Sequence, residues 1–423
     1  MSIAVTSAAN EKAVSRLLSA QPKLVGVSPA AKVIPGMGKK IFLHPGPPML
    51  WNEMTGPLRG AAVGAVLFEG YARNVRSALR ILQDGEIKFE SAHDHDSVCA
   101  MAGFISPSLP VFVVRNQTYG NYSFSPINEG VGRVPTLRYG AYNSRVIDRL
   151  NWIRDVLMPG LHAAIRRAKD FDLKHIIAES LKRGDECHNR NKSATAIFLK
   201  NIAPHLVRTE ESKSTSAEIL EFIGGNDHFF LNLSMAASKP TLDAAHGIRN
   251  SSMLTGMASN GHSFGIRVSG LGRTTPPYEW FKAASPYAIG KYFEGFTKKD
   301  ANRVLGDSYV SECAGIGGFA MAASPAITEF VGGTPEWAVA EVRKMRRITL
   351  TDNTNYVIPF MNYKGSPTGI DLRKVLKTRI LPIMNTGIAH NNAGIGQIGA
   401  GIFHAPMKCF LVADKAWHTS VNG

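Results

Sequence analysis

The chain has few cysteines, and they are not grouped as a redox or metal motif requires. Cys99, Cys187, Cys313 and Cys409 lie far apart in 423 residues and form no C-x-x-C pair or paired framework. This spacing is typical of reduced thiols in a cytoplasmic protein. Cys187 and His188 are neighbours, but a nucleophile and its base must meet in space, so we do not favour this cysteine as a nucleophile.

Long apolar runs are also missing. The sequence contains no apolar stretch of about 18 residues, so we expect no transmembrane helix and no membrane partner. The N-terminal segment lacks the apolar core of a signal peptide, which favours a cytoplasmic location. No H-E-x-x-H or G-x-x-x-x-G-K-[ST] motif is present, which disfavours a zincin protease and a P-loop kinase.

The chain carries a large net positive charge, but its basic residues are not concentrated in one segment. The chain has 48 Lys and Arg residues against 33 Asp and Glu residues, which gives a formal net charge of +15. The basic residues are scattered, whereas nucleic-acid-binding proteins usually gather them along one face or run. We therefore expect an anionic small-molecule substrate and no nucleic acid.

The spacing of apolar residues predicts an α+β protein of three parts. We expect an N-terminal α/β domain (1–145), a helical domain (146–220) and a glycine-rich C-terminal α/β domain (221–423). The individual elements predicted in the first two parts are helices over 10–20 and 60–72, strands over 41–43 and 111–114, and helices over 147–161, 171–183 and 193–206. Pro159-Gly160 should kink or break the helix that contains it.

The remaining elements follow from local patterns. The segment GDECHNRN (184–191) should form a turn or the start of a helix. FIGGNDHFFLNLSMAASK (222–239) is predicted as a turn, a strand and a helix, and GHSFGIRVSGLG (261–272) as a strand or hairpin.

Glycines near the C-terminus form a G-x-G-x-x-G pattern that includes Gly394 and Gly396. Such glycines let backbone N–H groups approach a phosphate or carboxylate. The pattern has no room for a complete dinucleotide-binding unit. A tight packing corner and an anion-binding loop remain equally good interpretations.

His93-Asp94-His95-Asp96 is the candidate metal site. In a strand, His93 and His95 would share one face and could ligate one ion. Polar runs of this kind also occur in metal-free loops, and no complete ligand set accompanies them.

Arg and Asn side chains recur beside glycines and apolar segments. Arg supplies a bidentate fork, and Asn offers both a donor and an acceptor, so together they suit a planar amide, ureido or carboxylate ligand. The candidate substrate-binding residues are Arg190, Asn189, Arg59, Asn116, Asn128, Glu129, Arg138, Asn226, Asn385, His390, Gly394 and Gly396.

Several long motifs occur in a fixed order along residues 40–410. They include HPGPPMLW, MAGFISPSLPVFVV, GDECHNRN, GIRVSG, GIGGFAMAASPAI and NTGIAH. Together they resemble the YlbE/AllG family, whose members accompany FdrA-type proteins. The resemblance implies a carbamoyltransferase-type enzyme or subunit of purine and ureide (allantoin) catabolism, which transfers a carbamoyl group between phosphate and an acceptor such as oxamate.

On this interpretation GDECHNRN forms a wall of the site. Asn189 and Arg190 would bind substrate, while His188 or Glu186 would transfer a proton, with His44 as a second candidate. We expect no cofactor. We expect the chain to form a homo-oligomer and to have an FdrA-like protein partner. One alternative is a metal-dependent amidohydrolase of a cyclic amide or ureide, with a divalent metal on His93 and His95. Another is a non-catalytic subunit that requires the FdrA-like partner.

Overall fold

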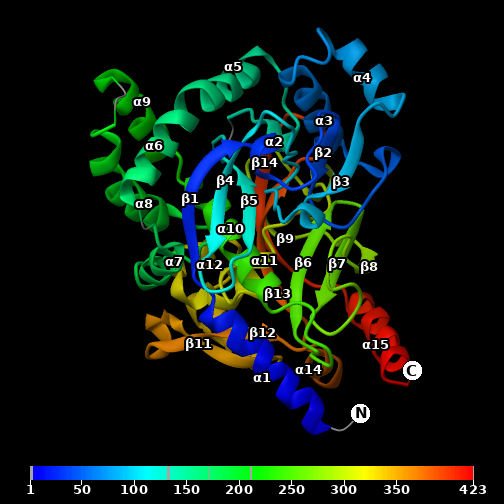
Figure 1. The fold of residues 1–423 in the computed structure, drawn as a ribbon. Helices are drawn as coiled ribbons and strands as arrows, with labels where there is room; N and C mark the ends of the chain where they lie inside the picture. The colour runs from blue at the N-terminus through cyan, green and yellow to red at the C-terminus, as the bar shows by residue number, and fades with distance from the viewer. Residues whose placement is uncertain (1–2, 131–133, 170, 210–211, 423) are drawn as a thin grey trace.

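The computed structural model describes residues 3–130, 134–169, 171–209 and 212–422. They form a mixed α+β fold, as the sequence predicts (Figure 1). The helices are α1 (Ile3–Ser19), α2 (Ala30–Val33), α3 (Gly56–Phe68), α4 (Val75–Gln83), α5 (Ser144–Trp152), α6 (Met158–Ala168), α7 (Leu173–Lys182), α8 (Lys192–Leu206), α9 (Lys213–Gly224), α10 (Phe229–Ala244), α11 (Val310–Cys313), α12 (Pro325–Phe330), α13 (Pro335–Arg346), α14 (Leu372–Thr378) and α15 (Met407–Asn422).

The strands are short and are distributed over several small sheets. Their bounds are β1 (Pro22–Pro29), β2 (Ile41–His44), β3 (Lys88–Ser91), β4 (Pro110–Asn116), β5 (Tyr122–Pro126), β6 (Leu254–Asn260), β7 (Ser263–Val268), β8 (Phe281–Ala284), β9 (Ile289–Tyr292), β10 (Leu305–Gly306), β11 (Thr349–Ile358), β12 (Lys364–Ile370), β13 (Ile383–Ala389) and β14 (Gln397–His404). The sheet orders are β1-β4-β5, β10-β6-β7-β8, β13-β14-β9, β11-β12 and β2-β3. Only the β2-β3 pair is parallel among these strands.

Helix α10 lies at the centre of the fold and packs against β4 and β5. Its residues from Phe229 to Pro240 are all buried. The sequence prediction of a strand within 222–239 is therefore wrong. A helix that is buried on every side has no polar stripe, so its apolar run resembles that of a buried strand.

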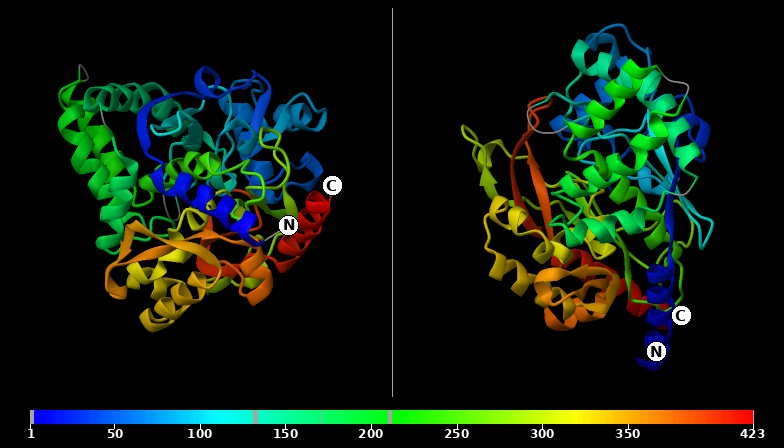
Figure 2. Two further views of the ribbon diagram at one scale, coloured as in Figure 1. Left: turned by 60° about the horizontal axis from the view of Figure 1, so that its bottom comes forward. Right: turned by 90° about the vertical axis from the view of Figure 1, so that its left-hand side faces the viewer.

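The helices between residues 144 and 224 form a layer along one side of the molecule, which both views of Figure 2 show in green. The helices predicted over 171–183 and 193–206 are confirmed as α7 and α8. The break predicted at Pro159-Gly160 takes the form of a π-helical turn, Ile153–Leu157, between α5 and α6. This turn places Pro159 in the first turn of α6, where its missing N–H costs little.

The largest of three hydrophobic core clusters among the described residues contains residues from all three predicted parts of the chain, while the two smaller clusters consist mainly of residues from the N-terminal part. Buried members of the largest cluster include Leu24 on β1, Ile176 on α7, Phe229 on α10 and Phe403 on β14. The division at residues 146 and 220 stays a prediction. None of the helices in the described part of the chain combines the length and apolar character needed to span a bilayer.

Candidate active site

The GDECHNRN segment forms the loop between α7 and α8, as predicted, and its own acidic side chains fold it. The Asp185 carboxylate accepts a hydrogen bond from the Ala194 N–H at 2.8 Å, inside the first turn of α8. The Glu186 carboxylate accepts from the N–H groups of His188 at 3.0 Å and Arg190 at 2.6 Å. Backbone N–H donors at the start of a helix favour negative charge, so the carboxylates of Asp185 and Glu186 stabilise the conformation of the loop.

A buried acid–base pair lies behind this loop. His188 Nδ1 lies 2.7 Å from an oxygen of Glu312, which also accepts a 2.9 Å hydrogen bond from the Gly318 N–H. Glu312 is fully buried on α11, and His188 is 3% exposed. Because Nδ1 contacts the carboxylate, proton exchange with a ligand would use the other ring nitrogen, Nε2, which forms no hydrogen bond to a described residue.

The glycine-rich block 315–318 makes room for this pair. Gly317 has a φ of +62°, and a Cβ built on it would lie 2.4 Å from the Glu312 carboxylate. Any other residue here would be strained and would collide with the acid. Glu312 was not among the residues predicted for the site, although an acid three residues before a buried glycine block was the available signal.

Burial perturbs the titration of these groups. It raises the pKa of Glu186 to about 7, against the opposing effects of His188, the Arg190 N–H and the Asn385 amide. Burial alone would lower the pKa of His188, but the charge and hydrogen bond of Glu312 outweigh it and raise that pKa. Glu186 therefore changes protonation close to neutral pH, where proton transfer is most effective.

A pocket of about 430 Å³ opens beside the loop. Its polar wall includes Asn189, Arg190, Lys192 and His228, and an apolar wall lies opposite. The complete lining is Asn189, Arg190, Asn191, Lys192, Asp227, His228, Phe293, Ala326, Ile327, Phe330 and Gln397. We call this cavity the site pocket. Its volume suits small ligands. Its two cationic side chains are ion-paired, Arg190 with Asp185 at 3.2 Å and Lys192 with Asp227 at 2.7 Å, so an anion bound here would share them with these carboxylates.

His228 joins the loop to a second polar network. Its Nε2 lies 2.8 Å from the Asn189 carbonyl oxygen. Burial and the charge of Arg138 lower the pKa of His228 to about 4, so the ring is neutral at pH 7. His228 therefore donates a hydrogen bond to the Asn189 carbonyl and adds no charge to the pocket.

The predicted residues Asn128, Glu129, Arg138 and Asn226 form this second network. The Asn226 amide donates to the Asn128 carbonyl at 2.9 Å, and Glu129 accepts from the Leu137 N–H at 2.7 Å. Arg138 is 5% exposed and donates to the Gly130 carbonyl, while its Nε has no hydrogen-bond partner. Sequence reasoning thus selected residues that the fold brings together beside the site pocket.

Asn385 belongs to the same centre. It lies on β13, is fully buried and stabilises the charged form of Glu186. Neither its Nδ2 nor its Oδ1 atom has a partner with good hydrogen-bond geometry. An amide with unused donor and acceptor capacity at a buried acid is suited to contact a ligand.

Three predicted site residues lie elsewhere and serve the fold. Arg59 is exposed, donates to the Asn52 carbonyl and covers the Trp51 ring. Asn116, at the end of β4, accepts from the Gln21 N–H just before β1, and His44 is buried against the Pro45 carbonyl. None of the three lines the site pocket.

The strand premise of the predicted metal pair is wrong, because Ala92–His95 forms a 3-10 helix. His93 Nε2 lies 3.1 Å from Asp307, whereas His95 contacts Glu90 and the Pro35 carbonyl. The two rings therefore bind different partners. In the described parts of the chain, no group of three or more His, Cys, Asp or Glu side chains could hold a metal ion.

The predicted residues His390, Gly394 and Gly396 lie in the loop between β13 and β14. The Gly394 N–H donates to the Tyr139 carbonyl at 2.8 Å, and the His390 N–H donates to the Gly396 carbonyl at 3.0 Å. His390 Nδ1 accepts from the Asn392 N–H at 2.8 Å. These contacts favour the packing-corner interpretation of the glycines.

Comparisons with known proteins give one consistent result. A family profile described as "Oxamate carbamoyltransferase subunit AllG" matches residues 87–308. The chain is 44% identical to the Escherichia coli protein of that description, over 98% of both chains. It is also 43% identical to the uncharacterized E. coli protein YahG, over 97% of this chain and 86% of that one.

A solved structure gives the same result at the level of the fold. The chain is similar to the crystal structure of a conserved protein of unknown function from Enterococcus faecalis V583, with a TM-score of 0.95. The two sequences are 42% identical, and the match covers 98% of each chain.

Proposed function

Because the chain belongs to the AllG family, we propose that it is a subunit of a carbamoyltransferase of ureide catabolism. The reaction transfers a carbamoyl group between phosphate and a small amide or amine such as oxamate. The observation that carries the proposal is the buried Glu186–His188–Glu312 centre next to a cationic pocket.

The chemistry needs a proton acceptor and an anion-binding wall. The acceptor nitrogen attacks the carbamoyl carbon, a C–N bond forms, the C–O bond to phosphate breaks, and the nitrogen loses one proton. His188 Nε2 receives this proton, and Glu312 stabilises the imidazolium that results. Arg190 and Lys192 hold the phosphate and offset the developing negative charge.

Neutral side-chain amides position the acceptor. Asn189 and Asn385 present amide groups that pair with an acceptor amide or carboxylate. The apolar side of the site pocket, which includes Phe293 and Phe330, limits water access to the reacting atoms. Catalysis of this kind relies on position and electrostatics more than on a covalent intermediate.

The decisive experiment measures phosphate release from carbamoyl phosphate with a panel of acceptors, including oxamate, other amides and ureides. It is run with the chain alone and with an added FdrA-like partner, because the similar E. coli protein is described as a subunit. Acceptor-dependent release in either mixture supports the proposal. No release with any acceptor in either mixture contradicts it.

A matched pair of arginine variants assigns any activity to the site pocket. Arg190 lines the pocket, while the exposed Arg183 directly precedes the loop, and its side chain pairs with Glu179 at 3.6 Å. Arg190→Ala should lower kcat/KM for carbamoyl phosphate by about 10- to 100-fold through the lost charge-assisted contact. Arg183→Ala should keep the wild-type value, and equal losses in both variants would remove Arg190 from the site.

A further inference from the structure

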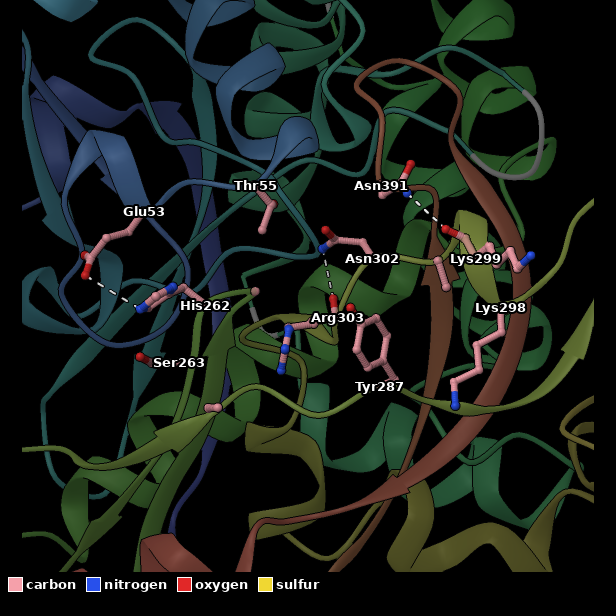
Figure 3. Close-up of a pocket in the computed structure, with 13 residues that line it drawn as sticks. Glu53, Thr55, His262, Ser263, Tyr287, Lys298, Lys299, Asn302, Arg303 and Asn391 are labelled. Carbon is pink, nitrogen blue, oxygen red and sulfur yellow. Dashed lines mark hydrogen bonds and ion pairs between the residues drawn. The ribbon is translucent and has the colours of Figure 1, made fainter.

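A second, larger cavity lies on the other side of the β13–β14 loop from the site pocket. Its volume is about 1010 Å³, and Asn391 from that loop contributes to its wall. Figure 3 shows its lining, which is Glu53, Thr55, Gly261, His262, Ser263, Ala284, Tyr287, Lys298, Lys299, Ala301, Asn302, Arg303 and Asn391. We call it the basic cavity.

Positive charge in the basic cavity is only partly compensated. Lys298 and Lys299 are exposed and form no ion pair with any described residue. The next residue, Asp300, does not line the cavity, and its carboxylate accepts from the Thr297 N–H at 2.8 Å. Glu53, the acidic residue of the lining, lies 3.6 Å from His262.

Apolar and aromatic surface continues from the cationic wall. Tyr287 is 41% exposed, and the Arg303 guanidinium lies over its ring at 5.0 Å. Ile289, at the start of β9, is 75% exposed. Strand β9 then leads to Phe293 in the wall of the site pocket, so one short segment joins the two cavities.

We propose that the basic cavity docks an extended, acid-rich segment of a partner chain, with an aromatic or aliphatic side chain on Tyr287 and Ile289. The combination of Arg, Tyr and exposed apolar surface is typical of protein interfaces, whose charged rim steers association. A site for a small anion would converge several buried donors on one point. Here the two lysines are exposed on the rim, and the cavity is more than twice the volume of the site pocket.

The test measures the binding of a short, fluorescently labelled, Glu-rich peptide that carries one Trp, by anisotropy at low and physiological salt. The full-length chain is used with two charge-matched double variants. K298E/K299E changes the cavity, and K12E/K200E changes exposed lysines on α1 and α8 by the same net charge. We expect more than a tenfold weaker affinity for the first and less than a threefold change for the second.

A neutral substitution separates docking from general attraction to a basic protein. Tyr287→Ala leaves the charge unchanged and should weaken binding about three- to tenfold through lost aromatic contact. Equal losses in the two double variants, or an unchanged affinity in Tyr287→Ala, would overturn the proposal. Displacement of the peptide by inorganic phosphate at similar concentration would identify a small-anion site and overturn it as well. Binding is read without turnover, so this result is independent of the proposed function.

Discussion

His188 is held by Glu312 through Nδ1, and its Nε2 atom forms no hydrogen bond to any residue that the structure describes. If that nitrogen takes the proton from the acceptor, His188→Ala removes the base and leaves the pocket in place. The rate of carbamoyl transfer should then fall by about 10²- to 10⁴-fold, the usual range for a general base. Steady-state phosphate release by the active preparation measures the effect on kcat and KM separately.

The matched control is His175→Ala, which removes an exposed imidazole from α7. This variant should retain wild-type kcat. A His188→Ala enzyme with full activity would exclude proton transfer by this ring, whatever the result for Arg190.

Glu186 gives the protein a pH-dependent stability. Its pKa rises from 4.5 to about 7 in the folded chain. Between these values the folded state binds a proton that the unfolded state lacks, so stability falls as pH rises through this window. The raised pKa of His188 acts in the same direction, because its contribution is present below 6.5 and is lost above the raised value.

Glu186→Gln removes the contribution of Glu186 to this pH dependence. From pH 5 to pH 8 the free energy of unfolding of the variant should improve relative to wild type by up to about 3 kcal/mol. Urea unfolding of both proteins at the two pH values measures this difference, in which any constant cost of the substitution cancels. A wild-type-to-variant gap that stays constant with pH would show that Glu186 titrates normally.

For single residues, the sequence identifies site residues that are close together in the chain, but it does not identify those that only the fold brings together. Glu186, His188 and Arg190 were recognisable because one short segment contains them. Glu312 is 124 residues from His188, and only the packing of α11 against the loop brings the two together. Arg59 and Asn116 have the same side-chain chemistry as the site residues, so their structural roles were invisible without the fold.

Among the elements, α3 makes an unusually close approach to its neighbours. A Cβ on Gly60 would lie 2.4 Å from the Gly140 carbonyl oxygen and 2.6 Å from the Ala393 Cβ atom. Both contacts belong to loops that frame the active site region. Gly60→Ala should therefore destabilise the protein by about 1–3 kcal/mol, as overpacking does.

Gly224→Ala provides the comparison. Gly224 ends α9, and its added Cβ would make an ordinary 3.4 Å contact with Leu199. This substitution should be neutral or stabilising by about 0.4–1 kcal/mol. Thermal unfolding of both variants compares the two sites. An equal melting temperature for Gly60→Ala and wild type would mean that α3 can move away from Gly140 and Ala393 at little cost.

Helices with a polar face and short apolar strands bounded by turns were predictable, whereas the buried central helix was not. Strands β2 and β4 and helices α7 and α8 match their predicted positions within a few residues. Helix α10 failed because it has no exposed stripe, and 92–95 failed because two alternating histidines do not require a strand. The periodicity of side chains reports burial on one face, so it is silent where every face is covered.

At the scale of the whole molecule, the shared core has a consequence for unfolding. Buried residues from β1, α7, α10 and β14 belong to one cluster. The 146–220 segment should therefore fail to fold as an isolated fragment, because α6 and α7 would lose their contacts with β1. Circular dichroism and amide-proton dispersion of the fragment, compared with the full chain, measure this.

A well-dispersed, cooperatively unfolding fragment would contradict that expectation and establish the helical part as a domain of its own. The full chain should show coincident transitions by tryptophan fluorescence and circular dichroism. Separate transitions would locate a boundary that the shared core does not suggest.

All four cysteine thiols are buried, so the rate at which each reacts with a labelling reagent measures local opening of the structure around it. The folded molecule should be almost silent toward a thiol-labelling reagent. Cys187 lies in the loop behind the site pocket, Cys99 donates its N–H to Asp307, and Cys409 lies on α15. The order in which these sites become labelled over time would show which part of the molecule opens first, and whether a bound ligand delays Cys187 alone.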